Sequence, residues 1–165
     1  MLALALTLQL LDVVPPPPPG ARIVERVVEI KVETSPSPDV ERQLVFVVSV
    51  KNTERRAYCI PRSYVPDYPR DGQRPVFVLD AKGDVIDMVE PYHEPEVGEA
   101  DTLVAIRPMQ ELRRVIYAGN DYRFPPERHE YVAVVGMGGF YCDELNAGRS
   151  RTPLVFKGRS KPFQM

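Results

Sequence analysis

The ten residues from Gln43 to Asn52, QLVFVVSVKN, constrain the fold of this chain more than any other segment. Apolar residues occupy every second position from Leu44 to Val50, and the positions between them become polar towards Lys51. Because side chains alternate between the two faces of a sheet, this pattern predicts a β-strand with a fully apolar face. We expect it to be a buried, central strand of an antiparallel sheet.

Further short apolar runs follow, and their ends are marked by Gly, Pro, Asn and Asp, which are turn residues. The additional strands are expected within residues 23–33, 75–80, 85–90, 102–107, 112–117, 129–136 and 154–156. The sequence Asp80-Ala-Lys-Gly-Asp84 predicts a hairpin turn in which Gly83 takes a left-handed conformation. Residues 55–74 are expected to be an irregular loop, and Gly136–Gly139 to end a strand.

The order of these signals resembles that of a known family. One strand ends in Lys51-Asn-Thr-Glu54, a strand–turn–strand hairpin follows, and Ile106-Arg-Pro-Met-Gln-Glu-Leu112 has the form apolar-x-Pro-x-x-x-Leu. A proline-led entry to a tyrosine-containing strand comes next. The chain in this respect resembles the immunoglobulin-like domains of exported bacterial proteins, which include proteinase-inhibitor-type domains and N-terminal domains of secreted metallopeptidases. The resemblance implies an all-β fold, an immunoglobulin-like antiparallel β-sandwich of seven to eight strands.

The resemblance does not extend to catalysis. The family usually has Gly-Glu or Gly-Gln after the proline, where this chain has Met109-Gln110, and no zinc-binding His-Glu-x-x-His sequence occurs. The chain has only two histidines, His93 and His129, and no Gly-x-Ser-x-Gly nucleophile motif. We therefore expect a protein that is not an enzyme and needs no cofactor.

The chain of 165 residues has room for one domain with flanking segments. Residues 1–21 contain an apolar run of signal-peptide length and then the polyproline segment Pro15–Pro19. The alternative is an extra strand over Ala5–Val14. We expect the domain to span 22–157, a basic C-terminal tail to span 158–165, and the protein to be periplasmic or secreted, without a transmembrane segment.

The two cysteines, Cys59 and Cys142, are separated by 83 residues and follow the ends of expected strands. An even number of cysteines in an exported chain favours a disulfide bond. The alternative is a pair of free, buried thiols.

The charges are divided along the chain, although the net charge is only -2 and does not suggest nucleic-acid binding. The segment 84–101 holds seven acids and no Lys or Arg, and a solvated loop is favoured there over a calcium site. His93 lies within this segment, where a solvated side chain is favoured over a metal ligand. We expect no metal site.

Arginines and tyrosines alternate in the expected loop 55–74, and these residue types dominate the binding energy of protein interfaces. The candidate partner-binding residues are Arg55, Arg56, Tyr58, Arg62, Tyr64, Tyr68 and Arg70. The alternative is that the rings cover the core. The sequence favours a non-catalytic protein-binding module of the periplasm or cell envelope, with a peptidase inhibitor acting through the 55–74 loop as the second hypothesis. It identifies neither the partner nor the oligomeric state.

Overall fold

The computed structural model describes residues 17–35, 43–62, 65, 76–89, 102–118, 122–127, 129–145 and 150–165, and these residues form an all-β protein. Its strands are β1 (Arg22–Val24), β2 (Val28–Ser35), β3 (Gln43–Lys51), β4 (Tyr58–Pro61), β5 (Val76–Leu79), β6 (Leu103–Ile106), β7 (Glu111–Tyr117), β8 (Glu130–Tyr141), β9 (Leu154–Arg159) and β10 (Phe163–Gln164). A short 3₁₀ turn at Cys142–Glu144 follows β8. No helix among these residues is long and apolar enough to cross a membrane.

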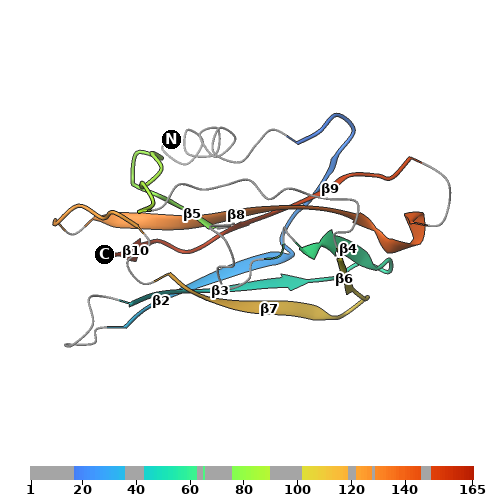
Figure 1. Cartoon of the computed structure of the whole chain (residues 1–165), viewed down its shortest axis with the longest axis horizontal. Coiled ribbons are helices and arrows are strands. Elements are labelled where there is room, and N and C mark those ends of the chain that lie inside the picture. The colour runs from blue at the N-terminus through green and yellow to red at the C-terminus, as the bar shows by residue number, and fades with distance from the viewer. Residues whose placement is uncertain are drawn as a thin grey trace.

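The strands form two sheets that lie one over the other (Figure 1). The larger sheet is mixed and has the order β1-β9-β8-β4-β6, with β5 and β10 also paired to β8. Only its β1–β9 pairing is parallel; the others are antiparallel. The smaller sheet is antiparallel and has the order β2-β3-β7.

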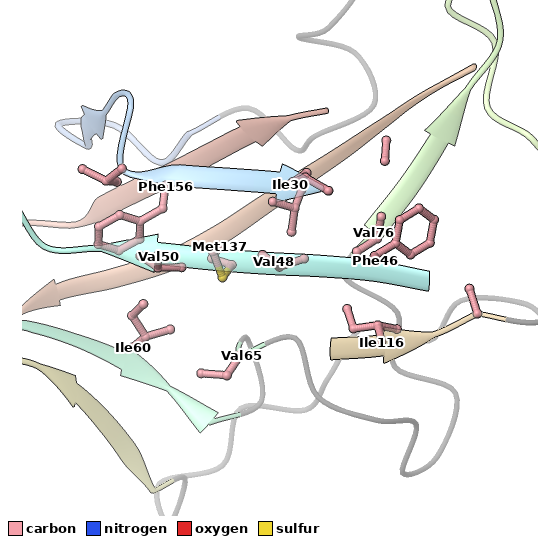
Figure 2. Packing of buried hydrophobic residues seen from close by; sticks show 14 of the residues in the cluster. Ile30, Phe46, Val48, Val50, Ile60, Val65, Val76, Ile116, Met137 and Phe156 are labelled. Carbon is pink, nitrogen blue, oxygen red and sulfur yellow. The ribbon is translucent and has the colours of Figure 1, made fainter. Parts of the chain in front are cut away.

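The central strand β3 confirms the alternation expected from its sequence. Leu44, Phe46, Val48 and Val50 are each no more than 2% exposed and belong to the main core cluster. Figure 2 shows Val48 and Val50 in one cluster with Met137 of β8 and Phe156 of β9, so that both sheets contribute to the core. The buried apolar area of this shared core is the main stabilising contribution of the fold.

The hairpin turn after β5 also confirms its sequence prediction. The side chain of Asp80 accepts hydrogen bonds from the backbone N–H groups of Lys82 and Asp84, at 2.8 and 2.9 Å. Gly83 has φ 91°, a left-handed conformation that glycine adopts without steric penalty. The returning segment is less regular than predicted, since it makes only isolated bridges such as Leu79–Val85.

The prediction that Gly136–Gly139 ends a strand is wrong, because β8 continues through these glycines to Tyr141. They lie within the pairing with β9, which extends to Gly139 opposite Leu154. A Cβ atom at Gly139 would lie 2.9 Å from the carbonyl oxygen of Cys59. This glycine therefore permits the close approach of β4 to β8.

The prediction that all of 55–74 is an irregular loop is also wrong, since Tyr58–Pro61 is the strand β4. It pairs with β8 and β6, and its first three residues are buried. Four residues ending in proline are too few to show a period-two pattern, so the pairing partners decide the structure here rather than the local sequence.

The consecutive strands β6 and β7 belong to different sheets, and each is the last strand in the order of its sheet. The tight turn between them contains Met109 in a left-handed conformation, with φ 63°. One continuous run of chain, 103–117, thus forms an edge of both sheets. Arg114 points to the core-facing side of β7, opposite Val48, and charge at such a position discourages further strand pairing.

The C-terminal residues are part of the sheet rather than the basic tail predicted for 158–165. Strand β9 continues to Arg159, and β10 pairs with β8 through Phe163 and Gln164. Ser160 and Met165 are buried. The N-terminal apolar run and the first two prolines of the polyproline segment, Pro15 and Pro16, lie outside the described residues.

Replacing Gly139 by alanine tests the close approach of β4 to β8. The added methyl group would meet a backbone carbonyl that is held by strand pairing, so the structure must shift. We expect Gly139→Ala to lower the free energy of unfolding by about 1–3 kcal/mol, measured by urea denaturation. An unchanged midpoint would show that the two strands are not in contact at this position.

Candidate binding surface at the disulfide end

Three connecting segments meet at one end of the two sheets, on the right of Figure 1, which we call the disulfide end. They are the loop 52–57 between β3 and β4, the turn 107–110 between β6 and β7, and the connection after β8, described at 142–145 and 150–153. Each begins where a strand of the core ends, so the sheets fix the points from which the segments leave.

Asn52 joins the first two segments. It is fully buried, and its backbone N–H donates to the carbonyl of Gln110 while its own carbonyl accepts from the N–H of Met109, both at 2.9 Å. Its side-chain amide donates to the carbonyls of Arg56 and Ile106, both at 2.8 Å. Its Oδ1 accepts a fifth hydrogen bond, from the backbone N–H of Glu54. Buried polar groups without partners are costly, and here both amide donors and the side-chain oxygen are satisfied.

The two sequence motifs that carry the family resemblance meet at this residue. Asn52 belongs to the Lys-Asn-Thr-Glu turn, and Ile106 opens the apolar-x-Pro-x-x-x-Leu motif. The motifs are 54 residues apart in sequence and are joined by the hydrogen bond from Asn52 to Ile106. Their joint role is therefore to fasten the loop 52–57 to the turn 107–110.

A disulfide between Cys59 and Cys142 confirms the predicted bridge and joins the loop region to the third segment. The Cα atoms are 5.0 Å apart, within the usual range for disulfides. The bridge links the adjacent strands β4 and β8: Cys59 lies within β4, paired with Phe140, and Cys142 follows the last residue of β8. Close by, the N–H of Cys142 donates to the carbonyl of Ala57 at 2.9 Å.

Arg56 is held by charged and aromatic groups of the third segment. Its guanidinium donates two hydrogen bonds to Asp143, at 3.0 and 2.5 Å, and one to Glu144, at 3.0 Å. It also lies 3.7 Å from the centre of the Tyr141 ring, in a cation–π arrangement. The hydrogen bond from Arg56 lowers the pKa of Asp143. For Glu144, hydrogen bonding from the backbone N–H of Thr152 is the leading cause of a lowered pKa, and Arg56 adds to it.

A second cluster lies on the other side of Tyr141. Its hydroxyl donates to Glu54 at 2.8 Å, and Arg22 of β1 donates both to this hydroxyl and to Glu54, the latter at 2.7 Å. The Tyr58 ring is fully buried beside Tyr141, with ring centres 6.1 Å apart. Burial, together with the negative charge of Glu54, raises the pKa of Tyr58 to about 12, so its phenol is neutral at physiological pH.

Basic and apolar side chains face solvent at this end, together with the Asp143 carboxylate that pairs with Arg56. Arg55 and Arg107 are exposed, and Met109, at the tip of its turn, is 74% exposed. Methionine and arginine are both enriched in protein interfaces. The arrangement is a base of hydrogen-bonded, ion-paired and disulfide-linked groups under a few exposed side chains, which suits binding to another macromolecule.

The structure places the predicted partner-binding residues in different environments. Arg55 is exposed, and Arg56 is part-exposed but engaged within the chain. The prediction for Tyr58 is wrong: it packs in the core against Phe156, so the alternative that the rings cover the core holds for this residue. Arg62 is exposed, and its backbone N–H donates to the carbonyl of Thr102. The remaining three candidates, Tyr64, Tyr68 and Arg70, lie outside the described residues.

Several residues of this surface were not identified from the sequence. They are Arg22, Asn52, Glu54, Met109, Tyr141, Asp143 and Glu144. The one available signal was the Lys-Asn-Thr-Glu motif, because a turn asparagine after a buried strand commonly bonds to nearby backbone.

The described cysteines and histidine have neighbours within the chain. Both thiols are in the disulfide, and His129 has an acidic neighbour, Glu127, at 3.8 Å. No group of three or more potential metal ligands occurs in the part of the chain that the structure describes. Residues 90–101 of the acidic segment, which include His93, lie outside that part.

Comparison with known proteins gives little guidance. No family model and no curated protein matches the chain. One solved structure is described as "X-ray structure of Northeast Structural Genomics Consortium target SoR45". Its alignment with this chain covers 84% of this chain and 83% of the solved chain, at 17% sequence identity and a TM-score of 0.40. A likeness of this size supports no statement about function.

Replacing Asn52 by alanine tests its role as the link between two segments. The change leaves the buried carbonyl of Ile106 without its donor, so we expect the free energy of unfolding to fall by about 2–4 kcal/mol in urea denaturation. The matched control is Ser49→Ala, at a half-buried position of the preceding strand β3, with an expected change within about 0.5 kcal/mol. A loss for Asn52→Ala no larger than that of the control would contradict this role.

The two acids that contact Arg56 should respond differently to its removal. In Arg56→Gln we expect the pKa of Asp143 to rise towards its ordinary value, while that of Glu144 stays lowered because Thr152 still donates to it. Both carboxyls have lowered pKa values in the folded protein. Their contribution to stability is therefore present above their unfolded pKa values and is lost as pH falls through the folded ones. Carboxyl-detected NMR titration measures both; equal responses of Asp143 and Glu144 would argue against the arrangement.

Proposed function

We propose that this chain is an immunoglobulin-like β-sandwich that acts as a non-catalytic protein-binding module of the periplasm or cell envelope. The observation that carries the proposal is the disulfide end, where three segments are fastened together and expose Arg55, Arg107 and Met109. Loops held by a rigid scaffold commonly carry binding.

The strand order supports the finer fold assignment. Constant-type immunoglobulin domains place strands A, B and E in one sheet and C, F and G in the other. Here β2, β3 and β7 share one sheet, and β4, β8 and β9 are neighbours in the other, in the same chain order. Strand β6 pairs with β4, in the position of the additional C′ strand of variable-type domains. The disulfide departs from the antibody pattern, because it joins two strands of one sheet rather than linking the sheets.

This assignment makes the disulfide end equivalent to the loop end used for recognition. In variable domains the B–C, C′–C″ and F–G loops form the binding surface. The corresponding B–C and F–G connections here are 52–57 and the segment after β8, and they are joined by Arg56 and the disulfide. Because these groups are already ordered, a partner would not have to order them on binding, which favours affinity.

The exposed groups indicate the chemistry of the partner. Two exposed arginines and an exposed methionine at the same end suit an apolar pocket bordered by carboxylates. Export is supported by the disulfide, which persists in oxidising compartments, and by the apolar run of 1–21. The peptidase-inhibitor hypothesis requires an inserting segment, which would lie beyond β4. Only Arg62 and Val65 of that segment are described, and no observation on them favours the hypothesis.

The experiment is affinity capture from an envelope extract of the source cells, followed by quantitative mass spectrometry. The baits are the wild-type chain, Arg55→Glu/Met109→Ala, and Lys82→Glu as a charge-matched control in the turn 80–84, away from the disulfide end. We expect one or more proteins to be enriched by the wild type and the control, and at least about tenfold less by the double variant. Absence of enrichment, or equal enrichment by all three baits, would overturn the proposal.

A further inference from the structure

Met109 differs from the other described methionines because it is exposed. It is 74% exposed at the tip of the turn 107–110, whereas Met137 and Met165 are 2% and 6% exposed. Met88 is half-buried and packs against the core. Exposure decides which methionine an oxidant reaches first. Among the residues that the structure describes, Met109 is therefore the methionine most open to oxidation.

The backbone of Met109 is in a left-handed conformation, with φ 63°. This conformation is unfavourable for residues with a Cβ atom, and glycine would adopt it without penalty. The turn thus holds a long thioether side chain at a position where glycine would be less strained. Residues in such conformations cluster at functional sites. The strain indicates that Met109 is present for the chemistry of its side chain.

The turn does not need the Met109 side chain to hold its shape. The N–H of Met109 donates to the carbonyl of Asn52 at 2.9 Å, and the N–H of Gln110 donates to the carbonyl of Arg107 at 3.0 Å. The Oε1 of Gln110 accepts from the N–H of Arg107 at 3.1 Å. Because these bonds join other groups, a chemical change at the sulfur of Met109 leaves them in place.

No thiol competes with this thioether for an oxidant. The chain has two cysteines, and they form the disulfide between Cys59 and Cys142. Thiolates are otherwise the sulfur groups that oxidants attack most readily. In the folded protein, the exposed sulfur of Met109 is left as the group to react.

We propose that reversible oxidation of Met109 to its sulfoxide by a peroxide controls partner binding at the disulfide end. This inference rests on the proposed function, because Met109 belongs to the surface that we propose binds a partner. In the reaction with hydrogen peroxide, the sulfur attacks one oxygen, an S–O bond forms and the O–O bond breaks. The transferred oxygen gives its proton to the departing hydroxide, which leaves as water. The sulfur loses two electrons and the peroxide gains them.

The sulfoxide changes the surface and not the fold. It is polar, so placing it in an apolar pocket of a partner would remove its hydrogen bonds to water without replacing them. In the free protein it stays hydrated, since Met109 is 74% exposed. The same change at Met137 would place a polar group in the core. Oxidation confined to Met109 can therefore be reversed without unfolding, by a methionine sulfoxide reductase that takes electrons from a dithiol and releases the oxygen as water.

The first measurement is the order in which the methionines are oxidised. The wild-type protein is treated with increasing hydrogen peroxide, and each methionine is followed by mass spectrometry of its peptides. We expect Met109 to react at least about tenfold faster than Met88, Met137 or Met165. The thermal unfolding midpoint should stay the same when only Met109 is oxidised. Equal reactivity of Met88 and Met109, or unfolding on oxidation of Met109, would overturn the inference.

The second measurement repeats the capture from an envelope extract with untreated, oxidised and reductase-treated bait, and untreated bait also receives the reductase as a control. We expect the oxidised bait to enrich the captured proteins at least about tenfold less, and the reductase to restore their enrichment. The matched variants are Met88→Leu and Met109→Leu, each before and after peroxide. Met88→Leu should lose enrichment on treatment as the wild type does. Met109→Leu should give the same result before and after treatment, because it has no thioether at this position.

The inference and the proposed function fail in different ways. No enrichment by the untreated wild type would overturn the proposed function, and the inference with it. Equal enrichment by untreated bait and by bait oxidised at Met109 would overturn the inference alone. A loss of enrichment that peroxide also causes in Met109→Leu would assign the effect to another residue, with the same consequence.

Discussion

The hydrogen bonding of Asn52 is the constraint on which the disulfide end depends. A buried strand must end somewhere, and its last polar groups need partners once water is excluded. Asn52 supplies them by joining the end of β3 to the start of β4 and to the β6–β7 turn. Without it, the edge run 103–117 would be fixed at this end by strand pairing alone. The disulfide and the ion pairs of Arg56 then attach the segment after β8 to the same unit.

Strand β3 serves both the core and the proposed binding surface. Its inner face packs between the sheets and fixes their positions, and its end orients the loops that we propose bind a partner.

The sequence predicted the structure where short local patterns determine it. It did not predict the structure where pairing with residues far away in the chain determines it. The alternation of β3, the turn at Gly83 and the Cys59–Cys142 bridge were all predictable from short patterns. Strand β4 was not predictable, because its four residues, which end in Pro61, show no alternation of apolar and polar residues. They form a strand because they pair with β8 and β6. The glycines of β8 suggested an end, whereas pairing with β9 continues through them. Among the candidate site residues, exposure of Arg55 was predictable, but burial of Tyr58 required knowledge of its strand.

Native-state hydrogen exchange at the disulfide end tests most directly whether its segments form one unit. The amides to follow are those of Asn52, Glu54, Met109 and Cys142, which donate the hydrogen bonds between and within the segments. If the segments are one unit, these amides open together, and their protection factors lie within about tenfold of one another. Rapid, independent exchange at Met109 while Cys142 remains protected would contradict the account.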